Sequence, residues 1–313
     1  MIRLAKLRSA RLSTPYLLSI LAVCVCTMSP TTALCGGAKI TFQQTLGLER
    51  TNDLSVQDGV LQAGLEMTAF SNSEVLLQNR LASGVTLRFG ADLLISGFPE
   101  TGGATEYQTG ISAEAIRNFG PGNIWQGRLK FEADRKVEGG DWVFQRARIG
   151  ARLRYRHDRQ HSTTAHLRFG YRDQNEMTFE EYDQAEYLAE VIHVWRPWSD
   201  RRSLTGTAYL ETRRAENDRY SYDEVGLRLA ARYPIVDGTE LTARLTVFDR
   251  SYGSDPLNGR RNDVRLLGTV TLTHEITKQT QLEVFVGWDN NRSTFKDRAW
   301  EGAIAGFSMT WKF

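Results

Sequence analysis

Arginine recurs at alternate positions over one short stretch of the sequence. Five arginines of the same parity lie between residues 146 and 156, and two more follow in the next apolar–polar segment. The set is Arg146, Arg148, Arg152, Arg154, Arg156, Arg168 and Arg172. A guanidinium is always charged and presents a fork of N–H donors, so such a row attracts anions. The alternative is that these arginines pair with carboxylates of neighbouring segments and only stabilise the fold.

The other reactive side chains show no arrangement typical of an enzyme or a metal site. The five histidines are scattered, and no Gly-x-Ser-x-Gly, His-Glu-x-x-His or acidic calcium-loop motif occurs. All three cysteines precede residue 39, so the rest of the chain has no thiol nucleophile and no cysteine-based metal site. We therefore expect no catalytic residues, no metal and no cofactor.

The first 38 residues have the composition of a secretory signal peptide. They carry four basic residues and no acid, then an apolar run over residues 16–28, then small residues up to Ala38. The apolar run is shorter than the roughly 20 residues that a membrane-spanning helix needs. Cys35 would suit a lipoprotein signal, but Leu34 before it is too large for that motif. We expect residues 1–38 to be removed after export across the inner membrane.

The net charge depends on whether this leader is counted. The whole chain has a formal net charge of +2, from 39 Lys and Arg against 37 Asp and Glu. Without the four basic residues of the leader, 35 basic residues stand against 37 acidic ones, a net charge of −2 over residues 39–313. A chain this close to neutral is not expected to bind nucleic acid.

Residues 39–313 alternate between apolar and polar residues with a period of two. In residues 85–95 every second residue is apolar, and in 143–155 apolar residues alternate with the arginines. Because successive side chains of a strand point to opposite faces, each such segment predicts a strand with one apolar face. About 14 segments follow the pattern, so we expect 12–16 strands. The predicted strands are 39–52, 59–71, 84–97, 105–118, 123–136, 141–156, 162–173, 184–196, 202–214, 221–233, 238–250, 263–275, 279–290 and 301–313.

The length of these segments favours a transmembrane barrel over a soluble sandwich. Each strand with its connection takes about 20 residues, more than the 5–6 residues of an ordinary globular strand and near what a tilted membrane strand needs. A sheet in lipid must close on itself, because unpaired backbone groups find no water there. Short connections also alternate with more polar and often longer ones, although residues 72–83 look too long for a periplasmic turn.

The last predicted strand ends the chain on an aromatic residue. Phe307, Met309, Trp311 and Phe313 share one face of this strand. The strand resembles the C-terminal signal that the barrel-assembly machinery reads in outer-membrane β-barrels of Gram-negative bacteria. The resemblance implies that these four residues form the assembly signal.

Residues 261–313 also resemble the closing strands of two narrower families. The matching features are Arg261-Asn262-Asp263 at the start of one strand, Asn291-Arg292-Ser293 after another, and residues 306–313. The families are the β-barrel porins of exopolysaccharide loci and the barrel of surface lipoprotein assembly modifiers. The modifiers carry a helical repeat domain before a 14-stranded barrel, and this sequence has none.

Together these patterns predict one all-β domain over residues 39–313, an antiparallel up-and-down β-barrel in contact with outer-membrane lipid and lipopolysaccharide. We expect a channel or export conduit in which the arginine row favours anionic solutes or an acidic polysaccharide. One alternative, implied by the resemblance to the assembly modifiers, is an accessory barrel that translocates a surface protein or lipoprotein. The other is an outer-membrane hydrolase.

Overall fold

The computed structural model describes residues 38–57, 60–99, 103–175, 181–197, 201–255 and 259–313, with the side chains of 51–66 and 254–255 left out. The expected signal peptide lies outside the described residues, except for Ala38. No helix in the described part of the chain is long and apolar enough to cross a membrane.

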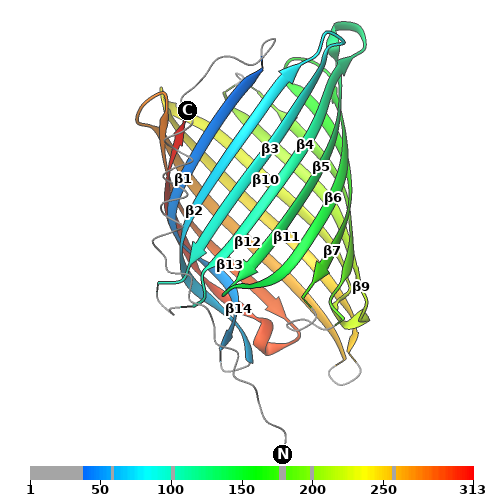
Figure 1. Ribbon diagram of the computed structural model, residues 1–313, viewed down its shortest axis with the longest axis vertical. Helices are drawn as coiled ribbons and strands as arrows, with labels where there is room; N and C mark the ends of the chain where they lie inside the picture. The colour runs from blue at the N-terminus through cyan, green and yellow to red at the C-terminus, as the bar shows by residue number, and fades with distance from the viewer. Residues whose placement is uncertain (1–37, 58–59, 100–102, 176–180, 198–200, 256–258) are drawn as a thin grey trace, which may run out of the picture. The chain divides into compact units, whose positions relative to one another are not determined.

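Fourteen strands account for most of the described residues (Figure 1). The shortest of them, β8, has 12 residues, which suffices for a tilted membrane strand. The strands are β1 (Lys39–Gln57), β2 (Val60–Arg80), β3 (Val85–Gly97), β4 (Glu106–Phe119), β5 (Trp125–Glu138), β6 (Asp141–Arg156), β7 (His161–Gln174), β8 (Gln184–Trp195), β9 (Ser203–Ala215), β10 (Tyr222–Val236), β11 (Thr239–Asp255), β12 (Gly259–Glu275), β13 (Thr280–Ser293) and β14 (Trp300–Lys312). Short 3-10 helices lie in three of the links: η1 (Pro121–Asn123), η2 (Asp218–Tyr220) and η3 (Lys296–Arg298).

The sheet closes into a barrel. Every strand pairs antiparallel with the next one in the sequence, and β1 pairs with β14. At this seam the backbone groups of Phe42 and Phe313 bond to each other in both directions, at 3.1 and 2.8 Å. A closed sheet has no edge of unpaired backbone groups, which is the condition for a sheet in lipid. The prediction of an antiparallel barrel with about 14 strands is confirmed.

The apolar residues of the alternating pattern form the outer face of the barrel. Leu129 on β5, Leu167 on β7 and Leu210 on β9 are 53%, 64% and 60% exposed. Comparable exposed side chains continue around the wall, among them Phe89, Ile111, Ile149, Val191, Val225, Val270, Val286 and Phe307. Such a continuous apolar exterior is larger than the patches a soluble monomer exposes and suits a hydrocarbon environment. The polar residues of opposite parity therefore face the interior.

The two ends of the barrel differ in their links. The end at which β1 starts and β14 stops has the links 81–84, 120–124, 157–160, 196–202, 237–238 and 276–279. In outer-membrane barrels the short turns face the periplasm, so this end is termed the periplasmic end and the opposite one the outer end. The outer end has longer links such as 98–105 and 175–183, but also the short turn 139–140. The predicted alternation of short and longer links is present without being strict.

The prediction that residues 72–83 form a long connection is wrong. Strand β2 continues to Arg80, and the link is only 81–84. The predicted strand ends at Ser71, but Ser71 and Ser73 both bond to the side chain of Gln44 on β1. Gln44 Nε2 donates to Ser71 Oγ at 3.0 Å, and Ser73 Oγ donates to Gln44 Oε1 at 2.6 Å. These polar groups are satisfied across the strand pair, so they do not end the strand.

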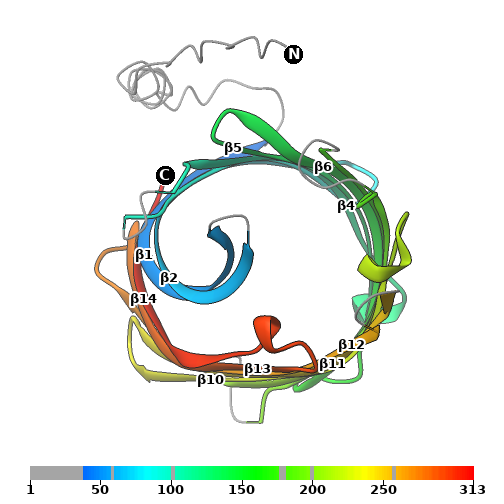
Figure 2. The ribbon, with the colours of Figure 1, turned by 90° about the horizontal axis from the view of Figure 1, so that it is seen from below.

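At the outer end, the ends of β1 and β2 and the β13–β14 link lie over the interior (Figure 2). Figure 2 shows the β13–β14 link, which contains η3, on the inner side of the ring of strands. Asn291 on the inner face of β13 is buried, and its Nδ2 donates to the carbonyl oxygen of Arg298 at 2.8 Å. Both observations place polar groups of this link inside the outer half of the barrel.

Candidate functional site, the charged lumen

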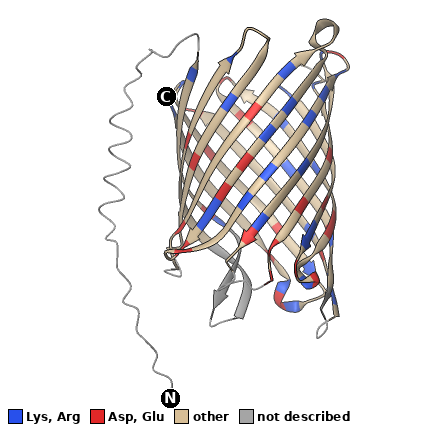
Figure 3. Cartoon of the chain, turned by 45° about the vertical axis from the view of Figure 1, so that its right-hand side comes forward, with Lys and Arg blue, Asp and Glu red and all other residues tan. Residues whose placement is uncertain are grey.

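The seven arginines predicted from the sequence all face the interior from β6 and β7. The two strands pair so that Arg146 lies opposite Arg172 and Arg152 lies opposite His166. Figure 3 shows that Lys and Arg recur along neighbouring strands of the wall. The structure therefore brings the seven guanidiniums to one wall. Their partners divide them into two groups.

Toward the outer end, carboxylates on β5 form ion pairs with the arginines of β6. Arg146 forms a fork on Asp134, with Nε and Nη2 at 3.1 and 3.0 Å from the two carboxylate oxygens. Nη2 of Arg148 is 3.4 Å from Asp134 Oδ1 and 3.9 Å from Glu132 Oε1. The register explains these pairs, because Asp134 lies opposite Arg146 and Glu132 lies opposite Arg148.

A buried carboxylate of β8 neutralises the same region from the other side. Glu186 is 1% exposed, and its Oε1 is 3.4 Å from Arg172 Nε. The same oxygen is 3.8 Å from Nη1 of both Arg146 and Arg213. Three guanidiniums around one carboxylate offset the free energy of removing it from water. Arg172 also lies over the ring of Phe144, 4.5 Å from its centroid, a favourable cation–π contact.

Arginine–carboxylate pairs continue around the outer half of the lumen. They are Arg250–Glu224, Arg261–Asp263 and Arg265–Asp289, and the three carboxylates are almost fully buried. Several of these guanidiniums also stack on aromatic rings: Arg250 lies 4.3 Å from the centroid of Tyr222. The outer half of the lumen is therefore lined by charges that cancel locally.

Sequence reasoning does not single out Asp134, Glu186 or Arg213 as part of this site. The alternation does place Asp134 on the same face of its strand as Glu132, and Glu186 on the same face as Glu190. This alternation shows that a side chain faces inward, but it does not show which arginine the side chain contacts. That depends on the register between strands.

Toward the periplasmic end, Arg152 has no carboxylate within ion-pair distance among the described residues. On β5 it lies opposite Arg128, a second cation. The carboxylate of Glu190 attracts Arg152 electrostatically, but it is already engaged by two other groups. His166 Nδ1 is 2.7 Å and Arg228 Nη1 is 3.4 Å from its oxygens. The positive charge of Arg152 is therefore largely uncompensated.

The other two arginines in the periplasmic half of β6 also lack a carboxylate partner among the described residues. Arg154 lies opposite Gln126 on β5, and the charges of Arg128, Arg156 and Arg196 repel it. Arg156 donates from Nη2 to the carbonyl oxygen of Gly122 at 2.8 Å and forms no ion pair within the described part of the chain. On β7, by contrast, Arg168 forms an ion pair with Glu211, with Nη2 3.9 Å from Oε2. The arginine wall is thus neutral in its outer half and positive in its periplasmic half.

The four residues assigned to the assembly signal line the outside of the closing seam. Phe307, Met309 and Trp311 share the outer face of β14, and Phe313, which directly follows the strand, is 67% exposed. Phe307 lies opposite Leu48 and Met309 opposite Leu46 on β1. This placement leaves the aromatic face accessible, and its reading by the assembly machinery stays a prediction.

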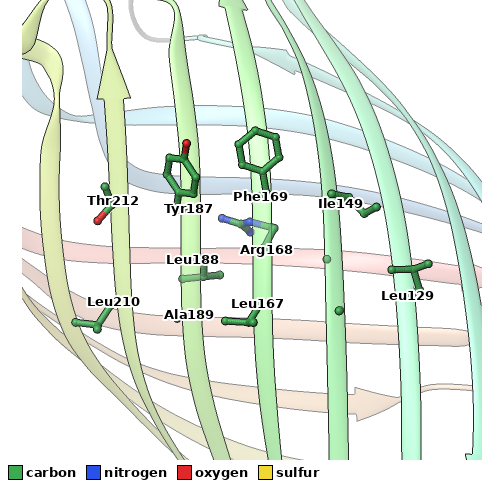
Figure 4. Close-up of a pocket in the computed structure, with 12 residues that line it drawn as sticks. Leu129, Ile149, Leu167, Arg168, Phe169, Tyr187, Leu188, Ala189, Leu210 and Thr212 are labelled. Atoms are coloured by element: carbon green, nitrogen blue, oxygen red, sulfur yellow. The ribbon is translucent and has the colours of Figure 1, made fainter.

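The outer face of the barrel also has a shallow depression of about 540 Å³ that extends across β5 to β9 (Figure 4). Its apolar lining residues are Leu129, Ile149, Ala151, Leu167, Phe169, Tyr187, Ala189 and Leu210. In Figure 4 these apolar side chains stand on the near side of the sheet, whereas Arg168 points to the other side. An apolar depression on the lipid face fits an acyl chain rather than a polar ligand.

Among the described residues, no group of three His, Cys, Asp or Glu side chains is placed to hold a metal ion.

Comparison with known proteins identifies the fold. No family model matches the sequence, and no curated protein matches it by sequence, so neither of the two narrower family resemblances is supported. Among solved structures, the chain is similar to in-vitro folded OmpT, an outer membrane protein of Vibrio cholerae. Their TM-score is 0.52 at 9% identity, over 88% of this chain and 97% of that one. OmpT expressed in the outer membrane gives a TM-score of 0.51 at 10% identity, over 90% of this chain and 99% of that one.

An anion-selective porin from Comamonas acidovorans gives a TM-score of 0.46 at 12% identity, over 88% of this chain and 100% of that one. At such identities a structural likeness concerns the fold alone. The chain folds as an outer-membrane β-barrel.

Proposed function

We propose that this chain is an outer-membrane channel whose lumen favours negatively charged solutes, either small anions or a strand of acidic polysaccharide. The observation that carries the proposal is the charge of the periplasmic half of the arginine wall. Arg152 and Arg154 face the lumen without a carboxylate partner among the described residues, whereas Arg146 and Arg172 on the same wall are paired.

The size of the barrel supports a conduit. Eight-stranded barrels are filled by their own side chains, whereas porins of 16–18 strands enclose an aqueous channel. Fourteen strands lie nearer to the second class. The interior is lined by charged and polar residues, as in water-filled barrels, and charges on the lipid face would cost about 2–4 kcal/mol each at the bilayer midplane.

The uncompensated arginines supply the selectivity. A row of like charges inside a wall of low dielectric constant concentrates field lines and raises the local concentration of counter-ions. The paired arginines of the outer half contribute little net field, because each lies within 4 Å of a carboxylate. Anion preference should therefore arise at Arg152 and Arg154.

The proposal includes the route to the membrane. The leader of residues 1–38 directs export, and the outer face of β14 presents Phe313 to the barrel-assembly machinery. The mature chain then contacts outer-membrane lipid and lipopolysaccharide, carries no cofactor and acts as a channel rather than as an enzyme.

Conductance of the purified barrel in a planar bilayer tests the proposal. Under a KCl gradient, the reversal potential should show a preference for chloride, and R152Q/R154Q should reduce that preference. The matched control is R232Q/E240Q, which removes an ion pair in the periplasmic half of another wall without changing the net charge.

Two results would overturn the proposal. One is an unchanged reversal potential in R152Q/R154Q, which would assign the arginines to the structure alone. The other is a barrel that does not conduct, which would favour the accessory role in translocating a surface protein or lipoprotein.

A further inference from the structure

A cavity lies at the periplasmic mouth of the barrel, beside the β6–β7 turn. Its volume is about 310 Å³. The residues that line it and carry the argument are Arg154, Arg156, Arg159, Arg196, Asp158 and Ser162. This set is termed the mouth site.

Three segments bring these residues together. The end of β6 supplies Arg154 and Arg156, whose side chains face inward, and the turn 157–160 supplies Arg159. Arg196 directly follows β8, and its backbone N–H donates to the carbonyl oxygen of Gln160 at 2.9 Å. That bond ties the end of β8 to the turn, so the four guanidiniums are held around one cavity by backbone structure.

The mouth site carries four guanidiniums and one carboxylate. The carboxylate of Asp158 is occupied within the turn, because its Oδ1 accepts the backbone N–H groups of Gln160 and His161 at 2.6 and 2.7 Å. These two bonds hold the pKa of Asp158 below its usual range, so it stays charged at neutral pH. Asp200, in the neighbouring link, lies outside the described residues.

The guanidiniums of the mouth site therefore lack ion-pair partners within the described part of the chain. Arg154 is repelled by Arg156 and Arg196, and no carboxylate offsets this repulsion at Arg154. A bound anion would relieve it. Guanidinium forks match the paired oxygens of phosphate and carboxylate groups, and several forks around one cavity favour an anion with more than one charge.

We propose that the mouth site binds a compact oxyanion with two or more negative charges, of the phosphate or pyrophosphate class. Its volume is at the lower end of the range for small-ligand sites, which suits a ligand of this size. The site goes beyond the proposed channel, since a barrel that does not conduct would still hold the anion. Because Arg154 and Arg156 face the lumen, a soluble anion reaches the site more directly than a lipid headgroup does.

Calorimetric titration of the purified barrel with inorganic pyrophosphate tests the site. The barrel is held in a zwitterionic detergent at 0.15 M NaCl. We expect saturable binding that R159Q/R196Q weakens about tenfold or more, through loss of charge-assisted hydrogen bonds. Both substitutions lie in links, and far-UV circular dichroism checks that the barrel is intact.

The matched control is R88Q/R232Q. It removes the same number of positive charges from the periplasmic half of the lumen, on walls where Arg88 and Arg232 pair with Glu114 and Glu240. At this ionic strength charges are screened beyond about 8 Å, so the control should bind within about twofold of the unsubstituted protein. Equal weakening in both variants, or no saturable binding in the unsubstituted protein, overturns the proposal.

A second measurement needs no substitution. It distinguishes a soluble anion from a lipid headgroup as the ligand of the mouth site. Pyrophosphate should slow modification of Arg159 by phenylglyoxal, followed by mass spectrometry, in nanodiscs of phosphatidylcholine. If nanodiscs containing phosphatidylglycerol already protect Arg159 without pyrophosphate, the lipid headgroup occupies the site. If only pyrophosphate protects it, the ligand is soluble. Absence of protection under all conditions contradicts the site, whatever the conductance measurements show.

Discussion

Arg146 and Asp134 face each other across the β5–β6 pair and form a bidentate ion pair, with N···O distances of 3.1 and 3.0 Å. Asp134 also lies 3.4 Å from Arg148, so one carboxylate is shared by two arginines. Further along the same strand pair, the partner of Arg152 is Arg128. The residues that β5 sets opposite β6 therefore differ between the neutral and the positive part of the arginine wall.

Removal of the Asp134 charge should make the channel more selective for anions. In D134N, Arg146 and Arg148 lose their shared carboxylate, so the positive part of the wall extends toward the outer end. We expect a reversal potential shifted further toward chloride. We also expect a free energy of unfolding lower by about 1.5–3 kcal/mol, the usual contribution of a hydrogen bond to a charged group.

The control for D134N is D237N. Asp237 pairs with Arg201 in exposed links at the periplasmic end, where an ion pair contributes little to stability. Neither the selectivity nor the stability should change in this variant. A D134N channel with unaltered selectivity would show that the outer half of the wall does not influence the permeating ion.

Gly226 leaves space for Tyr209, and filling that space should destabilise the barrel. A Cβ at Gly226 would overlap the ring of Tyr209, which lies opposite it on β9. The same ring carries the hydroxyl that donates to Glu224 at 2.7 Å, and the guanidinium of Arg228 lies 3.9 Å from the ring centroid. G226A should lower the free energy of unfolding by about 1–3 kcal/mol, measured by urea unfolding, because Tyr209 must leave this position.

The matched control is G206A on β9. A Cβ at Gly206 meets its nearest atom, in the side chain of Leu229, at 3.8 Å, an ordinary contact distance. This variant should unfold at nearly the same urea concentration as the unsubstituted barrel. Equal stability of G226A and G206A would mean that Tyr209 does not occupy the inner face as described.

The assembly signal can be separated from the stability of the seam. Phe313 joins β1 by backbone bonds with Phe42, and F313A keeps these bonds while removing the ring. If the ring is part of the signal, F313A should strongly reduce the amount of barrel assembled in the outer membrane of cells. Its stability after refolding in detergent should change by only about 0.5–1.5 kcal/mol, the contribution of one aromatic contact.

A phenylalanine elsewhere on the outer face provides the comparison. Phe89 on β3 is also half exposed and lies away from the closing strand. F89A should assemble normally. A similar loss of assembly in both variants would indicate a general requirement for an apolar exterior and no special role for Phe313.

Much of the fold is predictable because the side-chain period of a strand is fixed. Alternation at positions such as 85–95 identifies strands and the residues that share a face, and a sheet of this size with an apolar face must close in lipid. The prediction failed at the end of β2. The predicted strand ends at Ser71, and only the pairing with β1, in which Ser73 bonds to Gln44, shows that β2 continues.

The sequence by itself determined that the arginines from 146 to 156 share a face, since parity follows from covalent geometry alone. It did not determine which of them carry uncompensated charge. That depends on the register that sets Asp134 opposite Arg146 and Arg128 opposite Arg152, and on the folding that brings Glu186 of β8 within 4 Å of Arg146 on β6. Ion pairing falls off over a few ångströms, so only the tertiary structure, which fixes distances between strands, decides it.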